Sequence, residues 1–576
     1  MDNAQVAEVF ERIADLLELQ GENIFRIRAY REAARQIANL PTDIEELWRS
    51  NRLQEIPGVG QAIAEKIDEL LSTGRLRYLE ELEAKFPPGL VEMMRIPGVG
   101  PKRAMALFEK LGVSSVDELE QAAKEGRVRT IPGFGAKTEQ NILAGIARWR
   151  QHSARLPLGR ALPQAEQVIE LLRSHPAVRR ISYAGSLRRM VETIGDIDIL
   201  VASDRPAEVS AAFTTLPIVR EVLAHGSTRA SILTDRGLQV DLRVVEPDQW
   251  GAALQYFTGS KAHNIKLRDI ALRRRLKINE YGIFNAETDE RLGGAEEEDI
   301  YRALGMAMPP PELREDRGEI EAALAGALPR LVTLEEIRGD LHVHSTWSDG
   351  NASIEQMAQA AQAAGLQYIA ITDHSQGLGI ARGLSPDRVL ARLHELRAVQ
   401  ERLPGIRILN GTEVDIRADG SLDYDDSVLA TFDWVVASVH SGFNQSREQI
   451  TQRIIAAMHN PYVDAIGHPS GRIIGQRESY DVDIEAIIKA AVETGTALEI
   501  NASPDRLDLS DIHARLARDY GAKIVVNTDG HAPSNFAFLR YGVATARRAW
   551  LGPEHILNTL PVEELLAQRK CRKARV

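Results

Sequence analysis

The fold of the middle of the chain is decided by the stretch Gly185-Ser-Leu-Arg-Arg-Met-Val-Glu-Thr-Ile-Gly-Asp-Ile-Asp-Ile-Leu200. Near its end, apolar Ile197 and Ile199 alternate with Asp196 and Asp198, which is the pattern of a half-buried β-strand. Because alternate side chains of a strand point to one face, the two carboxylates are expected to project together. The Asp-x-Asp pattern alone would also fit an ordinary strand whose aspartates face solvent. Its interpretation therefore depends on the other residues of this region.

Those neighbours point to nucleotidyl transfer. Asp241, in Gln239-Val-Asp-Leu-Arg243, is expected on a neighbouring strand. Three convergent carboxylates can hold two divalent ions ~4 Å apart, one to activate a 3′-hydroxyl and one to bind a triphosphate. Gly185 and Ser186 offer a compact loop for phosphate oxygens, and Arg189 offers a cationic partner.

A phrase recurs three times before this region: Ile56-Pro-Gly-Val-Gly60, Ile96-Pro-Gly-Val-Gly100 and Ile131-Pro-Gly-Phe-Gly135. Each is followed by a helix-compatible stretch, so residues 1–150 are predicted to be helical, with three helix-hairpin-helix units. A Gly-x-Gly turn before a helix exposes N–H groups that bind phosphate. The alternative is a tight turn that only packs. The candidate DNA contacts are Gly58, Gly60, Lys66, Gly98, Gly100, Lys102, Gly133, Gly135 and Lys137.

From Ile337 onward, seven strand candidates alternate with helical stretches, which predicts a parallel α/β barrel. Histidines and carboxylates lie at or just past the ends of these strands, and barrel enzymes place their active sites at the C-terminal ends. We therefore expect all of these side chains to converge. The candidate metal ligands are His342, His344, Asp349, His374, Glu413, His440, His468, Asp529 and His531.

Imidazole and carboxylate ligands suit Zn²⁺, Mn²⁺ or Fe²⁺ better than Ca²⁺ or Mg²⁺. The set exceeds what one ion needs, so two or three ions are expected, bridged by Glu413 or Asp529. Such a centre would attack a phosphorus with activated water. The alternative, that these histidines are ordinary core residues, requires six of the 14 in the chain to coincide with strand ends.

With these motifs in place, the region from the N-terminus to about residue 310 resembles the family X DNA polymerases. The resemblance implies metal binding by Asp196, Asp198 and Asp241, with Mg²⁺ or Mn²⁺. The segment Tyr256-Phe-Thr-Gly-Ser260 is similar to that family's dNTP-binding segment, whose Tyr-Phe pair screens the sugar of the nucleotide. The segment Ile278-Asn-Glu-Tyr-Gly282 is similar to its thumb strand. The nucleotide contacts that the resemblance implies are Gly185, Ser186, Arg189, Gly195, Tyr256, Phe257, Gly259, Asn264 and Arg268.

The chain departs from polymerase beta, a familiar member of that family, at three positions. Lys261 replaces an acidic residue, and Gln239 replaces an arginine that handles the primer end. Lys66 matches the lysine that forms a Schiff base in the lyase segment, but Ala62 replaces a second lysine there. Since nearby cations help a lysine to lose its proton, lyase activity and a simple phosphate contact both remain open for Lys66.

Residues 337 to about 560 resemble the polymerase and histidinol phosphatase (PHP) domain. The motifs are His342-Val-His344, Thr372-Asp-His374, Gly467-His-Pro469 and Asp529-Gly-His531. Members joined to polymerases in this order are bacterial, and the resemblance implies 3′-5′ exonuclease activity, with abasic-site endonuclease or 3′-phosphatase activity as further options. Arg472 is a candidate phosphate contact.

We therefore expect a multidomain α/β protein. The predicted parts are a helical DNA-binding domain (1–150), an α+β nucleotidyltransferase palm (151–250), a small thumb for nucleotide selection (251–315), a linker (316–335) and a seven-stranded (β/α) PHP barrel (336–576). The expected function is short-gap filling in DNA repair, including base excision repair, combined with trimming of 3′ ends. The expected substrates are gapped or primed double-stranded DNA and dNTPs.

The composition and the net charge limit which partners and which cellular compartment are expected. The net charge of −12 argues weakly against nucleic-acid binding, but it is a sum, and basic runs such as 273–277 coexist with acidic regions. The single cysteine, Cys571, fits a reducing compartment. No apolar run approaches the ~18 residues that span a bilayer, so a cytoplasmic, nucleoid-associated monomer without membrane contact is expected.

Three other classes compete with this prediction. A phosphatase of small esters would need neither the hairpins nor the Tyr256-Phe257 pair. A non-catalytic DNA scaffold would not need complete carboxylate sets in both sites. A nucleotidyltransferase for RNA or small acceptors shares the Gly-Ser and Asp-x-Asp pattern, but the Tyr256-Phe257 pair and the DNA-type hairpins disfavour it.

Overall fold

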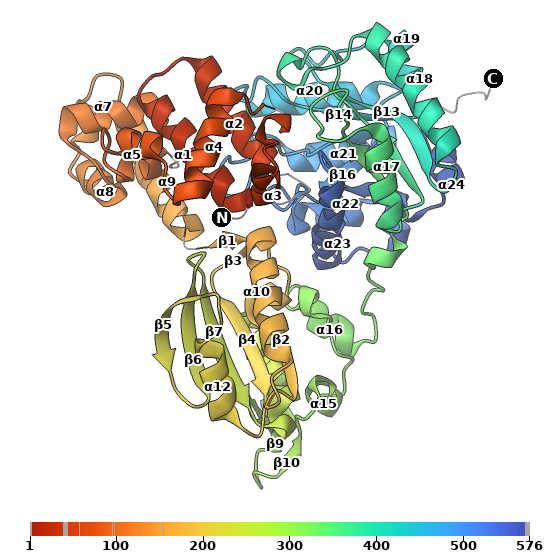
Figure 1. The fold of residues 1–576 in the computed structure, drawn as a ribbon. Helices are drawn as coiled ribbons and strands as arrows, with labels where there is room; N and C mark the ends of the chain where they lie inside the picture. Colours follow the sequence, from red (N-terminus) through yellow and green to blue (C-terminus); the bar gives the residue numbers. More distant parts are fainter. Residues whose placement is uncertain are drawn as a thin grey trace.

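The computed structural model describes residues 3–38, 44–56, 58–94, 96, 98–153 and 155–570, so Cys571 lies outside the described residues. Figure 1 shows the helical region (α1–α9) beside a barrel that ends in α24, with a separate β-sheet below them. Among the described residues, no helix is both long and apolar enough to cross a membrane.

The first 150 residues are helical, as predicted. Their apolar faces form one core, in which Phe10, Leu17 and Ile37 are almost fully buried. Each predicted hairpin has a glycine with positive φ, namely Gly58, Gly98 and Gly133. The helices are α1 (Asn3–Leu19), α2 (Ile24–Ala38), α3 (Ile44–Arg49), α4 (Gln61–Thr73), α5 (Arg77–Glu83), α6 (Gly89–Met94), α7 (Pro101–Leu111), α8 (Val116–Lys124) and α9 (Ala136–Ser153).

A five-stranded mixed sheet follows, in the order β2-β4-β7-β6-β5. The central pair, β4 and β7, is parallel, and its apolar residues pack against α10 and α12. A short β1–β3 pair lies at its start. The elements are β1 (Leu156–Pro157), α10 (Leu158–Arg173), β2 (Arg180–Tyr183), α11 (Gly185–Arg188), β3 (Thr193–Ile194), β4 (Ile197–Ala202), α12 (Pro206–Thr214), β5 (Val219–His225), β6 (Arg229–Thr234) and β7 (Gln239–Val245).

The predicted thumb region has its own small core, centred on Ile283, Ile300 and Tyr301. The expected linker, 316–335, contains α16 (Glu319–Leu324), and its Ile320 joins that core. This segment therefore packs onto the preceding elements. Those elements are α13 (Trp250–Thr258), α14 (Lys261–Arg273), β8 (Leu276–Asn279), β9 (Gly282–Asn285), β10 (Arg291–Gly293) and α15 (Glu297–Ala303).

The C-terminal region is the predicted barrel of seven parallel strands, paired in chain order from β11 to β17. A bridge from Val343 to Gly530 joins the first strand to the end of the last, so the barrel is nearly closed. The strands are β11 (Gly339–Val343), β12 (Tyr368–Ile371), β13 (Arg407–Asp415), β14 (Trp434–Ser438), β15 (Ala465–Ile466), β16 (Ala497–Asn501) and β17 (Ile524–Asn527).

Two apolar layers hold the barrel. Leu341, Ala370 and Leu409 belong to one cluster, and a larger cluster packs the strands against the surrounding helices. The helices are α17 (Ile354–Ala363), α18 (Pro386–Arg402), α19 (Asp426–Leu429), α20 (Arg447–His459), α21 (Ile484–Thr494), α22 (Asp511–Tyr520), α23 (Leu539–Arg548) and α24 (Val562–Ala567).

A buried ion pair links α18 to the barrel wall. Arg392 Nη1 donates to Asp373 Oδ2 at 3.0 Å, and both side chains are at most 1% exposed. We expect Arg392→Ala to lower the free energy of unfolding by about 3–5 kcal/mol, because it leaves a buried carboxylate without its cation. Urea unfolding would measure this, with Arg397→Ala on the exposed face of α18 as the control. Equal stability of the two variants would contradict the prediction.

Candidate metal centres and nucleic-acid contacts

The three palm carboxylates come together at one end of the central strand pair. Asp198 on β4 is the register partner of Asp241 on β7, and Asp196 directly precedes β4. Oxygen atoms of all three lie within 4.8 Å of one another. Burial, Asp196 and Asp241 raise the pKa of Asp198 to about 7. Such crowding of like charges is what a divalent cation relieves.

The loop before β4 touches this cluster. Gly185 has a φ of +61°, and a Cβ there would clash with the Asp198 carboxylate, so glycine is needed at this position. On the other side, Gln239 Nε2 donates to both carboxylate oxygens of Asp241 at 3.1 Å. Gln239 is thus held by the cluster itself. Ser186 follows Gly185 in α11, and Gly195 lies in the bend between β3 and Asp196.

The other candidate nucleotide contacts are largely engaged with protein groups. Arg189 Nε donates to Glu315 at 3.0 Å. Asn264 accepts from Gln255 at 2.7 Å and donates to the Tyr256 carbonyl at 2.8 Å. Of the remaining candidates, Arg268 is exposed on α14, and Gly259 ends α13. These contacts place the candidates on one side of the palm, but binding a triphosphate would require Arg189 to rearrange or share its partner.

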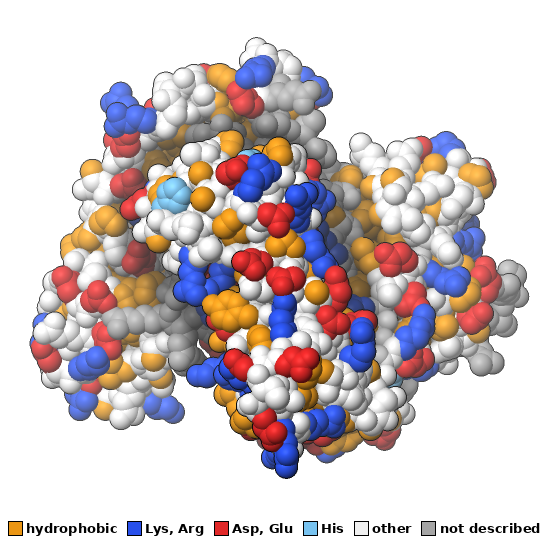
Figure 2. Space-filling model, turned by 90° about the horizontal axis from the view of Figure 1, so that it is seen from below, with side chains coloured by type: hydrophobic (Ala, Val, Ile, Leu, Met, Phe, Trp, Pro, Cys, Tyr) orange, Lys and Arg blue, Asp and Glu red, His pale blue; other side chains and the backbone are white. Residues whose placement is uncertain are grey.

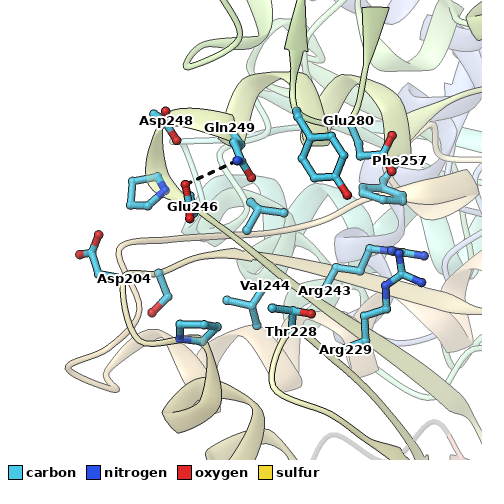
Figure 3. Close-up of a pocket in the computed structure, with 15 residues that line it drawn as sticks. Asp204, Thr228, Arg229, Arg243, Val244, Glu246, Asp248, Gln249, Phe257 and Glu280 are labelled. Carbon is cyan, nitrogen blue, oxygen red and sulfur yellow. Dashed lines mark hydrogen bonds between the residues drawn. The ribbon is translucent and has the colours of Figure 1, made fainter.

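A cavity of about 720 Å³ lies between the palm and the thumb (Figure 3). At one end of it, Arg229 and Arg243 extend side by side from paired positions on β6 and β7. The Arg243 guanidinium lies over the Phe257 ring, 4.3 Å from its centroid. Phe257 in turn packs edge-on against Tyr256. The predicted sugar-screening pair therefore lies at a cationic wall beside the carboxylates.

The three hairpins share one geometry. Gly60 and Gly100 both have φ −78° and ψ 175° and cap the helices α4 and α7. The lysines differ, because Lys102 and Lys137 are exposed, whereas Lys66 donates to the Ala62 carbonyl at 3.0 Å. Lys66 also lies 5.0 Å from the centre of the Tyr78 ring.

Basic and acidic side chains are interspersed on the face shown in Figure 2. On this face, the negative net charge of the whole chain therefore does not describe each local region.

All nine barrel candidates converge. Ligand atoms of eight of them form three groups, each within 4.8 Å, and His344 and His374 each belong to two of these groups. The ninth, His468, approaches Glu413. Glu413 lies at the centre, because one of its oxygens approaches His342, His344 and His374 while the other approaches two further histidines. Those two are His440 at 3.2 Å and His468 at 3.1 Å. The bridging role of Glu413 stays a prediction with which these two sets of neighbours agree.

The residues present fit metal ions. His342 Nε2, both ring nitrogens of His344 and His468 Nδ1 are buried without a hydrogen-bond partner among the described residues. Burial and the neighbouring histidines lower the pKa of His344 to about 4, which keeps its imidazole neutral and able to ligate. Buried polar atoms without partners cost free energy, and metal coordination would satisfy them.

Two further carboxylates orient the ligands. Glu499 on β16 accepts from His342 Nδ1 at 2.7 Å and from the His468 backbone at 2.7 Å. Asp415 lies 3.3 Å from His440 Nδ1. Carboxylates in this position fix the tautomer and ring direction of a ligating histidine. Our sequence analysis missed them, although Glu499 could have been found, since it is a carboxylate in the otherwise apolar sixth strand.

Arg472, the candidate phosphate contact, faces the palm. Its Nη2 donates to Glu192 at 2.7 Å and its Nε to the Arg506 carbonyl at 2.9 Å. The described contacts thus make it part of the junction between barrel and palm. The pair of Arg540 with Glu166 crosses the same junction, and the pair of Arg548 with Glu315 joins the barrel to the thumb region.

Four family models match the chain. Residues 1–76 match a helix-hairpin-helix domain, and residues 90–148 match a SAM-like helix-hairpin-helix tandem. Residues 253–315 match the DNA polymerase beta thumb, and residues 340–503 match the PHP domain. A helix-hairpin-helix region, a polymerase-type thumb and a PHP barrel define a class of polymerase with an attached phosphoesterase domain, for which divalent metal dependence is expected.

A relative in Bacillus subtilis, the DNA polymerase/3′-5′ exonuclease PolX, is 39% identical over 98% of this chain and 99% of its own length. This chain belongs to the PolX family, the bacterial family X DNA polymerases with a C-terminal PHP domain. A probable phosphatase of a Thermoanaerobacter species is 33% identical over 40% of this chain and 95% of its own length. A probable phosphatase of Syntrophotalea carbinolica is 31% identical over 38% of this chain.

Proposed function

We propose that this protein is a DNA-directed DNA polymerase that fills short gaps during DNA repair, and that its barrel is a 3′-5′ exonuclease. The observation that carries the proposal is the convergence, within one chain, of the palm carboxylates and of all nine barrel ligands. A small-ester phosphatase would need only the second set. A DNA scaffold would need neither.

In the palm, Asp196, Asp198 and Asp241 would hold Mg²⁺ or Mn²⁺, which activates the primer 3′-hydroxyl and neutralises the triphosphate. The protein's own residues contribute by positioning the carboxylates and the nucleotide. Gly185 keeps the loop close to Asp198, and Ser186 lies where a phosphate oxygen can be bound. The Tyr256-Phe257 edge would exclude the wrong sugar.

In the barrel, two or three ions of Zn²⁺, Mn²⁺ or Fe²⁺ would activate water and offset the charge of the scissile phosphate. Their ligands are His342, His344, Asp349, His374, Glu413, His440, His468, Asp529 and His531. Glu413 would bridge two ions, because its two oxygens face different histidines, and Glu499, which accepts from His342 Nδ1, would orient that ring.

The proposed substrates are dNTPs and gapped or primed duplex DNA. The three hairpins would grip the phosphate backbone without reading bases. Every proposed ligand of both centres comes from one chain, so we propose that the monomer is active.

The test uses a labelled primer on a gapped duplex with a 5′-phosphate, incubated in Mn²⁺. We expect extension when dNTPs are present and 3′ shortening when they are omitted. Since the affinity rests on backbone contacts, both activities should fall as salt rises. Shortening without extension would contradict the polymerase assignment, and extension without shortening would contradict the exonuclease assignment.

A further inference from the structure

A second cavity, of about 670 Å³, lies where three parts of the chain meet. The second hairpin contributes Gly98, Val99 and Gly100, and the palm contributes Glu192 and Thr193. The opposite wall is the barrel segment 470–480, which follows the candidate ligand His468. The glycines of the other two hairpins do not line it. The second hairpin is thus the one that faces the barrel.

The hairpin wall is suited to a phosphate. Gly100 caps α7, a helix of 11 residues, so the positive end of that helix faces the cavity. Within the described part of the chain, the backbone N–H groups of Gly100 and Lys102 donate to no acceptor. Free N–H groups at a helix N-terminus bind phosphate oxygens.

The barrel wall supplies an independent observation. Ser470 lines the cavity and is 3% exposed, and its Oγ has no hydrogen-bond partner among the described residues. Arg477 also lines the cavity and forms no ion pair with a described carboxylate. Trp149, from the end of α9, adds an aromatic ring to the lining. A buried free hydroxyl, a cation and a ring are the groups that bind a nucleotide strand.

The cavity leads toward the metal cluster. Arg472, which lines the cavity, donates through Nε to the Arg506 carbonyl at 2.9 Å. Arg506 Nε lies 3.7 Å from the candidate ligand Asp529, and its buried Nη1 has no hydrogen-bond partner among the described residues. A cationic path therefore runs from the hairpin side of the cavity to the proposed phosphoesterase centre.

We propose that the second hairpin also serves the barrel, by holding a single DNA strand that passes through this cavity with its 3′ end at the metal cluster. This inference rests on the proposed exonuclease function. A cavity of this volume is in the range of about 300–1,000 Å³ that encloses one small ligand, which fits a nucleotide or two of a single strand.

The test places a negative charge on the hairpin. Gly100 has a φ that any residue adopts, and a Cβ there would meet nothing within 4 Å, so Gly100→Asp should fold. Ser115→Asp is the matched control, because Ser115 caps α8 in the same region and does not line the cavity. Binding would be measured with a fluorescent, phosphorothioate-linked oligothymidylate on the metal-loaded protein. Hydrolysis would be measured on ordinary oligothymidylate and on bis(p-nitrophenyl) phosphate.

For Gly100→Asp we expect about tenfold weaker binding and about tenfold slower 3′ degradation, since one phosphate contact is replaced by repulsion. Hydrolysis of bis(p-nitrophenyl) phosphate should be unchanged, because so small an ester does not reach the hairpin. Ser115→Asp should match the unaltered protein in all three assays. Unchanged binding by Gly100→Asp, or an equal loss on the small ester, would overturn the proposal. If the unaltered protein degrades no DNA, the exonuclease function fails, and the binding comparison still decides the role of the hairpin.

Discussion

Primer extension should fall by at least about a thousandfold when Asp196 and Asp198 are both replaced by alanine, while 3′ shortening continues at its normal rate. The reason is geometric. The two side chains share one cluster with Asp241, and a single remaining carboxylate cannot hold the ions that the transfer requires. The barrel ligands come from other strands and do not depend on these residues.

The thermal stability of the same variant tests whether the pKa of Asp198 in the palm is raised. Burial and the neighbouring carboxylates raise the folded-state pKa of Asp198 to about 7, above its ordinary value of 3.8. The free energy of unfolding therefore falls as pH rises from about 4 through 7, because Asp198 ionises less readily in the folded state than in the unfolded state. Without metal at pH 8, the double variant should melt no lower than the unaltered protein.

The matched control is Asp235→Ala, in the exposed β6–β7 turn, which should leave extension unchanged. Assays of extension and shortening on the same labelled primer would measure both activities. Residual extension above one percent would sink the assignment of the palm centre; loss of both activities would show that the two centres depend on each other.

The parts of the sites that follow a strand period could be predicted from sequence. Asp196 and Asp198 are two apart on or beside one strand, and the barrel ligands fall at strand ends, so the repeat of the backbone brings each set together. The same reasoning identified three hairpins, because Gly-x-Gly marks a backbone conformation that few other residues adopt.

The parts that depend on the packing of distant segments could not be predicted. Arg189 pairs with Glu315, 126 residues away, and Arg472 pairs with Glu192, 280 residues away. No local pattern encodes such pairs, since each depends on how barrel, palm and thumb pack together. Two candidate phosphate contacts of the sequence analysis therefore turned out to have protein partners.

His344→Ala is expected to reduce 3′ shortening by at least about a thousandfold and to leave primer extension unchanged. His344 belongs to two of the three ligand groups, so its removal affects more than one ion. Its Nε2 lies 3.2 Å from Asp529 and 3.5 Å from Glu413, and its Nδ1 lies 3.7 Å from Asp349. The side chain thus touches all three carboxylates of the centre.

The metal content of the His344→Ala variant shows whether the loss of activity comes from the metal centre of the barrel. The purified variant should carry fewer equivalents of transition metal than the unaltered protein, measured by mass spectrometry of the released ions, because two ligand groups are incomplete. His459→Ala, on the exposed end of α20, is the control and should keep full metal content and full shortening. If His344→Ala shortens primers at the normal rate, the barrel cluster is not the nuclease centre, and the 3′ trimming must arise elsewhere in the chain. If it loses shortening but keeps all its metal, His344 acts on the substrate and the ions are held by the remaining ligands.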